Sequence, residues 1–177
     1  MQKAGWQSIL NNFKRYVESE NYSAQNKLQF SIEINVPPNI VYDKMLGLSD
    51  IKTYKQWTAE FNPSSTYDGS WQKGSEIHFV GVDENGKRGG MVSQIVENIP
   101  NKFVSIQHIG ILVDDKVITK GPEIEPWSGA FENYYFEYIG GKTLLKIEMD
   151  SNDEFKEYFV SIWPKALAKL KEICEEK

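Results

Sequence analysis

The sequence predicts an α+β protein in which a curved antiparallel β-sheet wraps around a long C-terminal α-helix. Three observations predict this fold. Residues 28–36 alternate strictly between apolar and polar side chains, as a half-buried strand does. From residue 66 onward, strand-like segments are separated by turn residues, and from residue 155 onward apolar residues recur at spacings of three and four. A sheet and a helix that are each apolar on one side bury those sides against each other.

The chain begins with an amphipathic pattern over residues 4–20, and a polar linker follows. We therefore divide the chain into an N-terminal helix and linker (1–25) and one domain (26–177). The opening helix also matches the closing helix at four pairs of positions: Trp6/Trp163, Leu10/Leu167, Lys14/Lys171 and Glu18/Glu175. Either the opening helix is the remnant of an upstream copy of the domain, or the shared helical period produces the matches. Its apolar face must be covered by the outside of the sheet, the mouth of a pocket or a second subunit, so a homodimer is one expectation.

The first strand is followed by two expected short helices. Pro37 and Pro38 end the strand, and Asn39 is the expected cap of a helix over about 40–47. A second helix over about 49–57 is expected to follow Ser49.

Two hairpins are expected in the strand-rich region. Asn85-Gly86 lies between EIHFVGV and GGMVSQIV, and Gly140-Gly141 joins SGAFENYYFEYI to KTLLKIEMD. Residues 98–101 are the expected turn between the strands of the first hairpin and KFVSIQHIGILV. The stretch 113–126 is expected to be an irregular, partly acidic loop.

The closing helix has one apolar face and contains a proline. Pro164 removes the hydrogen bond to the Val160 carbonyl, so we expect a kink or a break there. The apolar face is formed by Phe155, Phe159, Ile162, Trp163, Ala166, Leu167, Leu170, Ile173 and Cys174.

Composition and charge exclude several classes of function. The formal net charge is −5 without a basic stripe, which argues against a nucleic-acid partner. The single cysteine, Cys174, excludes an internal disulfide and suits a reducing compartment. Since neither an apolar leader nor a run long enough to span a membrane is present, we expect a cytoplasmic protein. The absence of metal-ligand spacings and nucleotide-binding motifs predicts neither a metal nor a cofactor.

The two-residue loop Gly140-Gly141 fixes a strand register. Ile139 then pairs with Lys142, and Glu132 pairs with Met149 on the same apolar face as Tyr134 and Phe136. A carboxylate on an apolar face is costly unless it is paired, neutral or solvated. Two interpretations remain open: Glu132 binds backbone amides at the sheet rim, or it lines a pocket.

The same counting applied to Asn85-Gly86 places His78 opposite Ser93. With a four-residue turn over 98–101, it places His108 opposite Met91, so both histidines share one face of the sheet. We expect His108 to be a satisfied structural histidine and His78 to be exposed.

Four stretches of the chain carry a resemblance to a known family: INVPPNIVYDKMLGLSDIKTYKQW, GSWQKGSEIHFVGVDENGKRGGMVSQIVENIPNKFVSIQHIG, WSGAFENYYFEYIGGKTLLKIEMD and YFVSIWPKALAKLKEI. In this order they resemble the START-like (SRPBCC) superfamily, and more narrowly the prokaryotic proteins similar to the activator of heat-shock protein 90 ATPase. The resemblance covers about residues 27 to 175 and depends on the order of loose motifs along the chain.

The resemblance implies a helix-grip fold with a cavity between the sheet and the last helix. Members of the superfamily bind lipids, polyketides, hormones or other apolar ligands there, and a minority are enzymes. The subgroup that this chain resembles is largely without assigned activity, and no motif of the enzymatic branches is present. The fold therefore says little about function by itself.

Three functional hypotheses follow. The first is a non-catalytic module for a small hydrophobic or aromatic ligand. The second is a protein-interaction role like that of the chaperone activator, with a heat-shock chaperone as partner. The third is a cavity enzyme in which Glu132 is an acid or base assisted by His108. The expected ligand-binding residues are Trp57, Phe61, Met91, His108, Trp127, Glu132, Tyr134, Phe136, Trp163 and Leu167.

Overall fold

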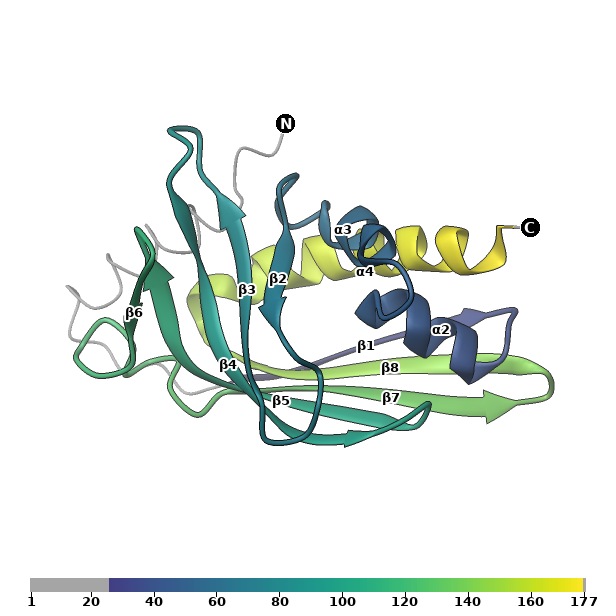
Figure 1. Ribbon diagram of the computed structural model, residues 1–177. Helices are drawn as coiled ribbons and strands as arrows, with labels where there is room; N and C mark the ends of the chain where they lie inside the picture. Colours follow the sequence, from purple (N-terminus) through teal and green to yellow (C-terminus); the bar gives the residue numbers. More distant parts are fainter. Residues whose placement is uncertain (1–25, 177) are drawn as a thin grey trace.

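The computed structural model describes residues 26–176, and in this part of the chain a curved sheet wraps around one long helix (Figure 1). The fold is the expected α+β helix-grip arrangement. The elements are β1 (Asn26–Ile34), α2 (Pro38–Leu46), α3 (Ile51–Thr58), β2 (Thr66–Gly69), β3 (Glu76–Val82), β4 (Arg88–Ile99), β5 (Phe103–Val113), β6 (Lys116–Ile118), β7 (Phe131–Ile139), β8 (Lys142–Ser151) and α4 (Asp153–Glu175).

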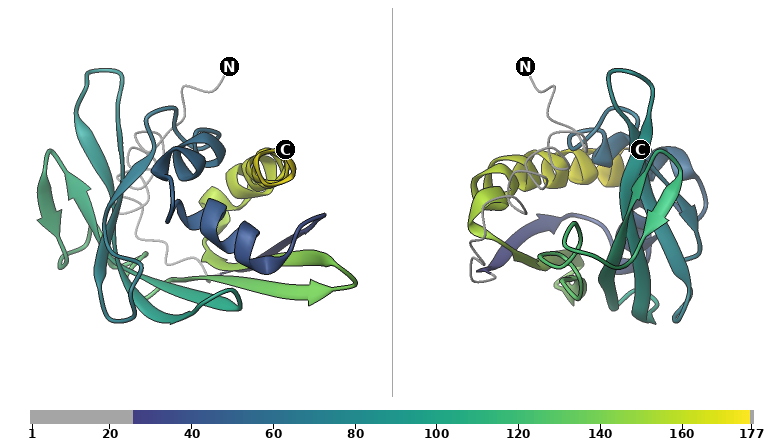
Figure 2. Two further views of the ribbon diagram at one scale, coloured as in Figure 1. Left: turned by 45° about the vertical axis from the view of Figure 1, so that its right-hand side comes forward. Right: turned by 90° about the vertical axis from the view of Figure 1, so that its left-hand side faces the viewer.

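The strands form one sheet in the order β1-β8-β7-β5-β4-β3-β2, and β6 pairs with β5. All the pairs are antiparallel. The two views of Figure 2 show that the sheet curves and that α2, α3 and α4 lie on its concave side. Because β1 pairs with β8, the first and last strands lie side by side beneath α4.

Helix α4 follows β8 after a single capping residue. Asn152 Oδ1 accepts a hydrogen bond from the Phe155 amide at 3.1 Å, and two acidic residues occupy the first turn, where the helix dipole favours negative charge. Its buried face carries the residues that the apolar period predicts. Burial of each large apolar side chain contributes about 1.5–3 kcal/mol.

No break occurs at Pro164, because α4 runs as one helix from Asp153 to Glu175. The proline lies on the exposed side of the helix, and the Val160 side chain is 49% exposed. The carbonyl that loses its intrahelical donor therefore faces the solvent side, where water can replace the missing hydrogen bond.

The two short helices are present, but their expected caps are wrong. Helix α2 begins at Pro38, and no side chain caps it, so Asn39 is a helical residue and not the cap. A proline in the first helical position needs no donor, which makes a side-chain cap less important there. Helix α3 is capped by Asp50, whose carboxylate accepts from the Lys52 amide, and not by Ser49.

The register expected for β7 and β8 is confirmed. Ile139 pairs with Lys142, Phe136 with Leu145, Tyr134 with Ile147, and Glu132 with Met149. Gly140 and Gly141 both have positive φ, which the tight two-residue turn requires.

The register expected for β3 and β4 is wrong by one residue. A hairpin does form at Asn85-Gly86, but the loop includes Glu84, because the Gly86 amide bonds the Asp83 carbonyl at 3.0 Å and Gly86 is left-handed. This is a type I turn followed by a bulge, so the loop has one residue more than expected. His78 consequently pairs with Val92 and not with Ser93.

The histidines therefore lie on opposite faces of the sheet. His108 pairs with Ser93 and not with Met91. The expected four-residue turn over 98–101 is wrong, because β4 continues to Ile99, which pairs with Phe103, and a register shift follows at Ile95/Glu97. His108 is buried on the concave side. His78 is partly exposed on the other face and lies 2.7 Å from the Glu76 carboxylate.

The stretch expected to be a loop after β5 contains a short strand. Asp114 and Asp115 both adopt positive φ and turn the chain, so that β6 pairs back onto β5. Residues beyond β6 are irregular, as expected. The expected helix over 4–20 and its linker lie outside the described residues.

Candidate functional site

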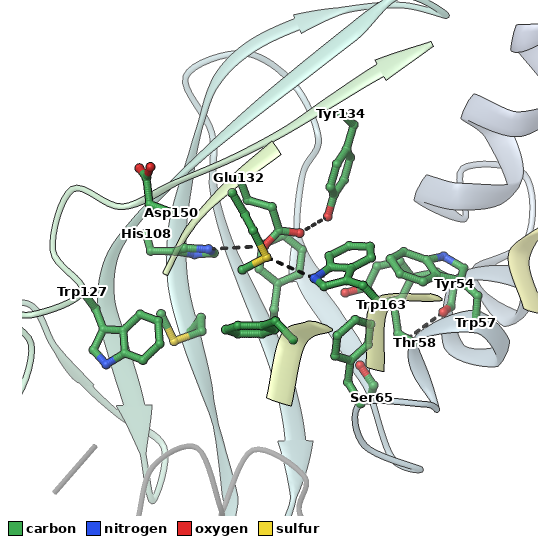
Figure 3. Close-up of a pocket in the computed structure, with 15 residues that line it drawn as sticks. Tyr54, Trp57, Thr58, Ser65, His108, Trp127, Glu132, Tyr134, Asp150 and Trp163 are labelled. Carbon is green, nitrogen blue, oxygen red and sulfur yellow. Dashed lines mark hydrogen bonds and ion pairs between the residues drawn. The ribbon is translucent and has the colours of Figure 1, made fainter. Parts of the chain in front are cut away.

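A small hollow lies between the concave face of the sheet and helices α3 and α4 (Figure 3). Its volume is about 80 Å³. An engineered cavity of about 150 Å³ holds a benzene ring, so this hollow has about half that capacity. Its lining is Tyr54, Trp57, Thr58, Phe61, Ser65, Phe79, Met91, His108, Trp127, Glu132, Tyr134, Met149, Asp150, Phe159 and Trp163.

Aromatic rings form most of the wall near α3 and α4. Trp163 lies with its ring centre 5.9 Å from that of Trp57 and 5.1 Å from that of Phe61. The indole N–H of Trp57 donates to the Met45 carbonyl at 2.9 Å, and that of Trp163 lies 3.1 Å from the Met149 sulfur. Since both N–H groups have partners, these two side chains offer their ring surfaces and not a donor to the hollow.

One carboxylate stands at the polar end of this aromatic wall. Glu132 comes from β7, and its side chain is 16% exposed. The Tyr134 hydroxyl donates a hydrogen bond to Oε1, and His108 Nε2 lies 3.5 Å from Oε2 (Figure 3). Glu132 thus lines the hollow, and among the described residues its partners are side chains and not backbone amides.

His108 is held from its other side by a serine on the neighbouring strand. Ser93 Oγ lies 2.8 Å from His108 Nδ1, and Ser93 is fully buried. Three strands, β4, β5 and β7, therefore contribute one chain of polar contacts from Ser93 through His108 and Glu132 to Tyr134. Such a network fixes the orientation of the carboxylate.

Two tyrosine hydroxyls in this region keep their protons strongly. Burial raises the pKa of Tyr134 well above its usual value, and the negative charge of Glu132 adds to the effect. Burial raises the pKa of Tyr54 in the same way, with Glu132 again the second cause. Both hydroxyls are thus hydrogen-bond donors across the physiological pH range.

The far end of the hollow is formed by Trp127 and Asp150. Trp127 lies between β6 and β7 and packs against Phe155 of α4, with ring centres 4.9 Å apart. Asp150 Oδ2 accepts from the Phe131 amide at 2.9 Å, and Oδ1 lies 4.0 Å from Lys27 Nζ. The charge of Asp150 is therefore already compensated.

The structure brings together every expected ligand-binding residue except Phe136 and Leu167. Phe136 packs edge-on against Tyr42 in the core, and Leu167 is buried in the helix–sheet interface outside the lining. Residues that the sequence analysis did not select also line the hollow: Tyr54, Thr58, Ser65, Phe79, Met149, Asp150 and Phe159. The alternation of apolar and polar residues along β3 and β8 could have shown that Phe79 and Met149 face the inside of the sheet.

The described part of the chain contains neither a metal-binding cluster nor a membrane-spanning helix. Among residues 26–176, no three His, Cys, Asp or Glu side chains gather closely enough to hold a metal ion. Within the same part of the chain, no helix is long and apolar enough to cross a membrane.

Comparisons with known proteins identify the fold. No family model and no curated protein matches the chain, whereas 223 chains of solved structures do. The Aha1 dimer from Colwellia psychrerythraea has a TM-score of 0.58 and 24% identity over 85% of this chain and 96% of that one. An uncharacterized protein from Rhizobium leguminosarum has a TM-score of 0.58 and 14% identity over 87% and 98%.

A third structure, CalU16 from Micromonospora echinospora, has a TM-score of 0.55 and 14% identity over 85% of this chain and 75% of that one. At such identities the similarity shows a shared fold. The chain has the START-like helix-grip fold, which agrees with the resemblance seen in its sequence. The similarity to the Aha1 structure is one of fold.

Proposed function

We propose that the protein binds a small, mainly apolar or aromatic ligand in the hollow between the sheet and α4. One observation carries the proposal. The carboxylate of Glu132, which is mostly shielded from solvent and held by Tyr134 and His108, stands at the end of a wall of aromatic rings. Ligand sites in proteins combine an apolar lining with a few fixed polar groups, and this hollow has that composition.

The volume restricts the ligand. A hollow of about 80 Å³ accepts a short chain or a small head group, whereas a lipid needs much more space. Met91 and Met149 line the hollow, and methionine side chains change rotamer readily, so they provide some adjustment of its shape. The ligand is therefore either a small molecule or a larger molecule of which only a small part enters the hollow.

The test is a fragment titration followed by two-dimensional amide NMR. Short-chain and single-ring fragments are expected to shift amides of the strands and helices that line the hollow. In a Met91→Trp variant, the larger side chain fills the hollow, so the shifts should disappear while the rest of the spectrum stays dispersed. A Trp71→Phe variant is the control, because Trp71 is buried but does not line the hollow. Fragments that shift no lining amide in the wild type would overturn the proposal.

A second candidate function is protein interaction. The similarity to the Aha1 dimer favours it, together with two apolar side chains at the tip of the β7–β8 hairpin, Tyr138 and Ile139, which are 64% and 54% exposed. The expected partner is a heat-shock ATPase of the heat-shock protein 90 type, and a second copy of the chain is the alternative. Pull-down and ATP-turnover measurements test the first, and light scattering after size exclusion tests the second. A Tyr138→Ser, Ile139→Ser variant should weaken whichever association is found.

A further inference from the structure

In the part of the chain that the structure describes, the carboxylate of Glu132 has no Lys or Arg partner. Among the described residues, the only positively chargeable group that lies within 4 Å of Glu132 is the imidazole of His108. Asp150, the other acid in the lining, is compensated by the Phe131 amide and Lys27. A buried carboxylate without a cation is costly, and a cationic ligand removes that cost.

His108 does not need to supply the missing charge. Its Nδ1 lies 2.8 Å from Ser93 Oγ, and its Nε2 faces Glu132. A neutral ring with its proton on Nε2 can accept the Ser93 hydroxyl proton at Nδ1 and point its N–H at Glu132. Both contacts are therefore satisfied by a neutral imidazole, which leaves the charge of Glu132 in the hollow.

Aromatic rings lie close to the carboxylate of Glu132. Figure 3 shows Glu132, Tyr134 and Trp163 pointing toward one another, and the Trp163 N–H is occupied by the Met149 sulfur. The faces of Trp and Tyr rings attract cations, and burial strengthens this attraction. Glu132 also has acceptor capacity left, because a carboxylate accepts about four hydrogen bonds and, of residues 26–176, only Tyr134 and His108 approach it.

We propose that the ligand is an organic cation, a primary or methylated ammonium group on a short apolar body. This inference rests on the proposed binding function and names its ligand class. The ammonium group lies against Glu132 and the rings of Tyr134 and Trp163, and the apolar body extends along Trp57 and Phe61. A head group of a few heavy atoms matches a hollow of about 80 Å³.

The test compares three probes with the same carbon chain: n-butylammonium, n-butanol and butyrate. Each is titrated into the full chain at pH 7 and followed by amide NMR and calorimetry. We expect n-butylammonium to bind about tenfold more tightly than n-butanol, and butyrate to show no binding, since its charge repels that of Glu132. This comparison uses the wild type and does not depend on whether a variant folds.

Two variants test whether Glu132 causes the preference for n-butylammonium over n-butanol. Glu132→Gln should abolish the advantage of n-butylammonium over n-butanol while both still bind. Glu137→Gln, on the same strand but outside the lining of the hollow, changes the net charge equally, so it should retain the preference. Equal binding of n-butanol and n-butylammonium by the wild type would overturn the cation inference and leave the proposed function standing. Binding of no probe, together with no fragment in the NMR titration, would overturn both.

Discussion

The imidazole Nε2 of His108 lies 3.5 Å from a carboxylate oxygen of Glu132, inside a hollow that is otherwise lined mainly by rings and methionines. The two side chains come from β5 and β7, which pair directly. The relationship depends on a third strand, because Ser93 of β4 holds the other ring nitrogen. The polar end of the hollow is thus fixed by the sheet and not by a loop.

Replacement of Ser93 by Ala should release the ring of His108. The variant leaves a buried Nδ1 without its partner, which costs about 1–3 kcal/mol in the free energy of unfolding. Urea denaturation measures this cost. Nitrogen NMR of the imidazole measures the change of tautomer that a purely structural loss would not produce.

A Ser105→Ala variant is the matched control for Ser93→Ala. Ser105 is also buried, on the neighbouring strand β5, and it does not line the hollow. Its loss should change the free energy of unfolding by less than about 0.5 kcal/mol. Equal stabilities of the two variants, with unchanged ring shifts of His108, would contradict the assigned role of Ser93.

The position of Glu132 could be predicted from the sequence because one turn determined it. Gly140-Gly141 fits a two-residue loop, and the pairing of β7 with β8 then follows by counting over an unbroken ladder. The alternation along β7 also placed Tyr134 beside Glu132. Where a tight turn leads into regular strands, local sequence decides which side chains meet.

The strand pairing that places His108 beside Glu132 could not be predicted in the same way. Asn85-Gly86 is compatible with loops of two or three residues, and a difference of one residue moves His78 to the other face. The bulge between Ile95 and Glu97 has no marker in the sequence, and Pro100-Asn101 is compatible with turns of three or four residues. Tyr54 lies on a helix, and a helical period gives its buried face without saying what that face meets.

Gly90 of β4 is predicted to accept no side chain. A Cβ atom there would lie 1.9 Å from the Phe79 carbonyl oxygen and 2.9 Å from the Val80 Cα. Because both obstacles are backbone atoms of β3, Gly90→Ala should force the strands apart and cost at least about 3 kcal/mol in the free energy of unfolding. Urea denaturation followed by circular dichroism measures the loss.

The control for Gly90 is Gly140→Asn at the hairpin tip. Gly140 has φ 58°, and nothing lies within 4 Å of an added Cβ atom. Asn tolerates this left-handed conformation, so the cost should stay below about 1 kcal/mol. A Gly90→Ala protein as stable as Gly140→Asn would show that β3 and β4 do not approach as closely as described.

Tyr158 of α4 should make the protein sensitive to alkali. Its hydroxyl is buried without a hydrogen-bond partner among the described residues, and burial raises its pKa to about 12. In the unfolded chain, the pKa of a tyrosine is about 10. The folded state therefore holds the proton more tightly, and the stability that this contributes is present below pH 10 and lost as the pH rises toward 12.

Replacement of Tyr158 by Phe removes both the unpaired hydroxyl and its titration. The variant should be at least as stable as the wild type at pH 7, because an unsatisfied buried hydroxyl is lost. Its free energy of unfolding should fall less steeply between pH 10 and 12. Tyr138→Phe, at a 64% exposed position, should leave that slope unchanged. Parallel curves for Tyr158→Phe and wild type would contradict the burial of this hydroxyl.

Cys174 should report the opening of the last turn of α4. The thiol is 3% exposed, and burial raises its pKa to about 12, so a disulfide reagent should react slowly with the folded protein at pH 8. Lys44 Nζ of α2 donates to the Ile173 carbonyl at 2.7 Å and holds this turn in place.

Lys44→Met keeps the alkyl chain but loses a hydrogen bond of about 1 kcal/mol, which should speed the labelling of Cys174 about fivefold. Lys52→Met, an exposed change on α3, should leave the rate unchanged. Equal rates in all three proteins would mean that the turn opens without breaking the contact to α2.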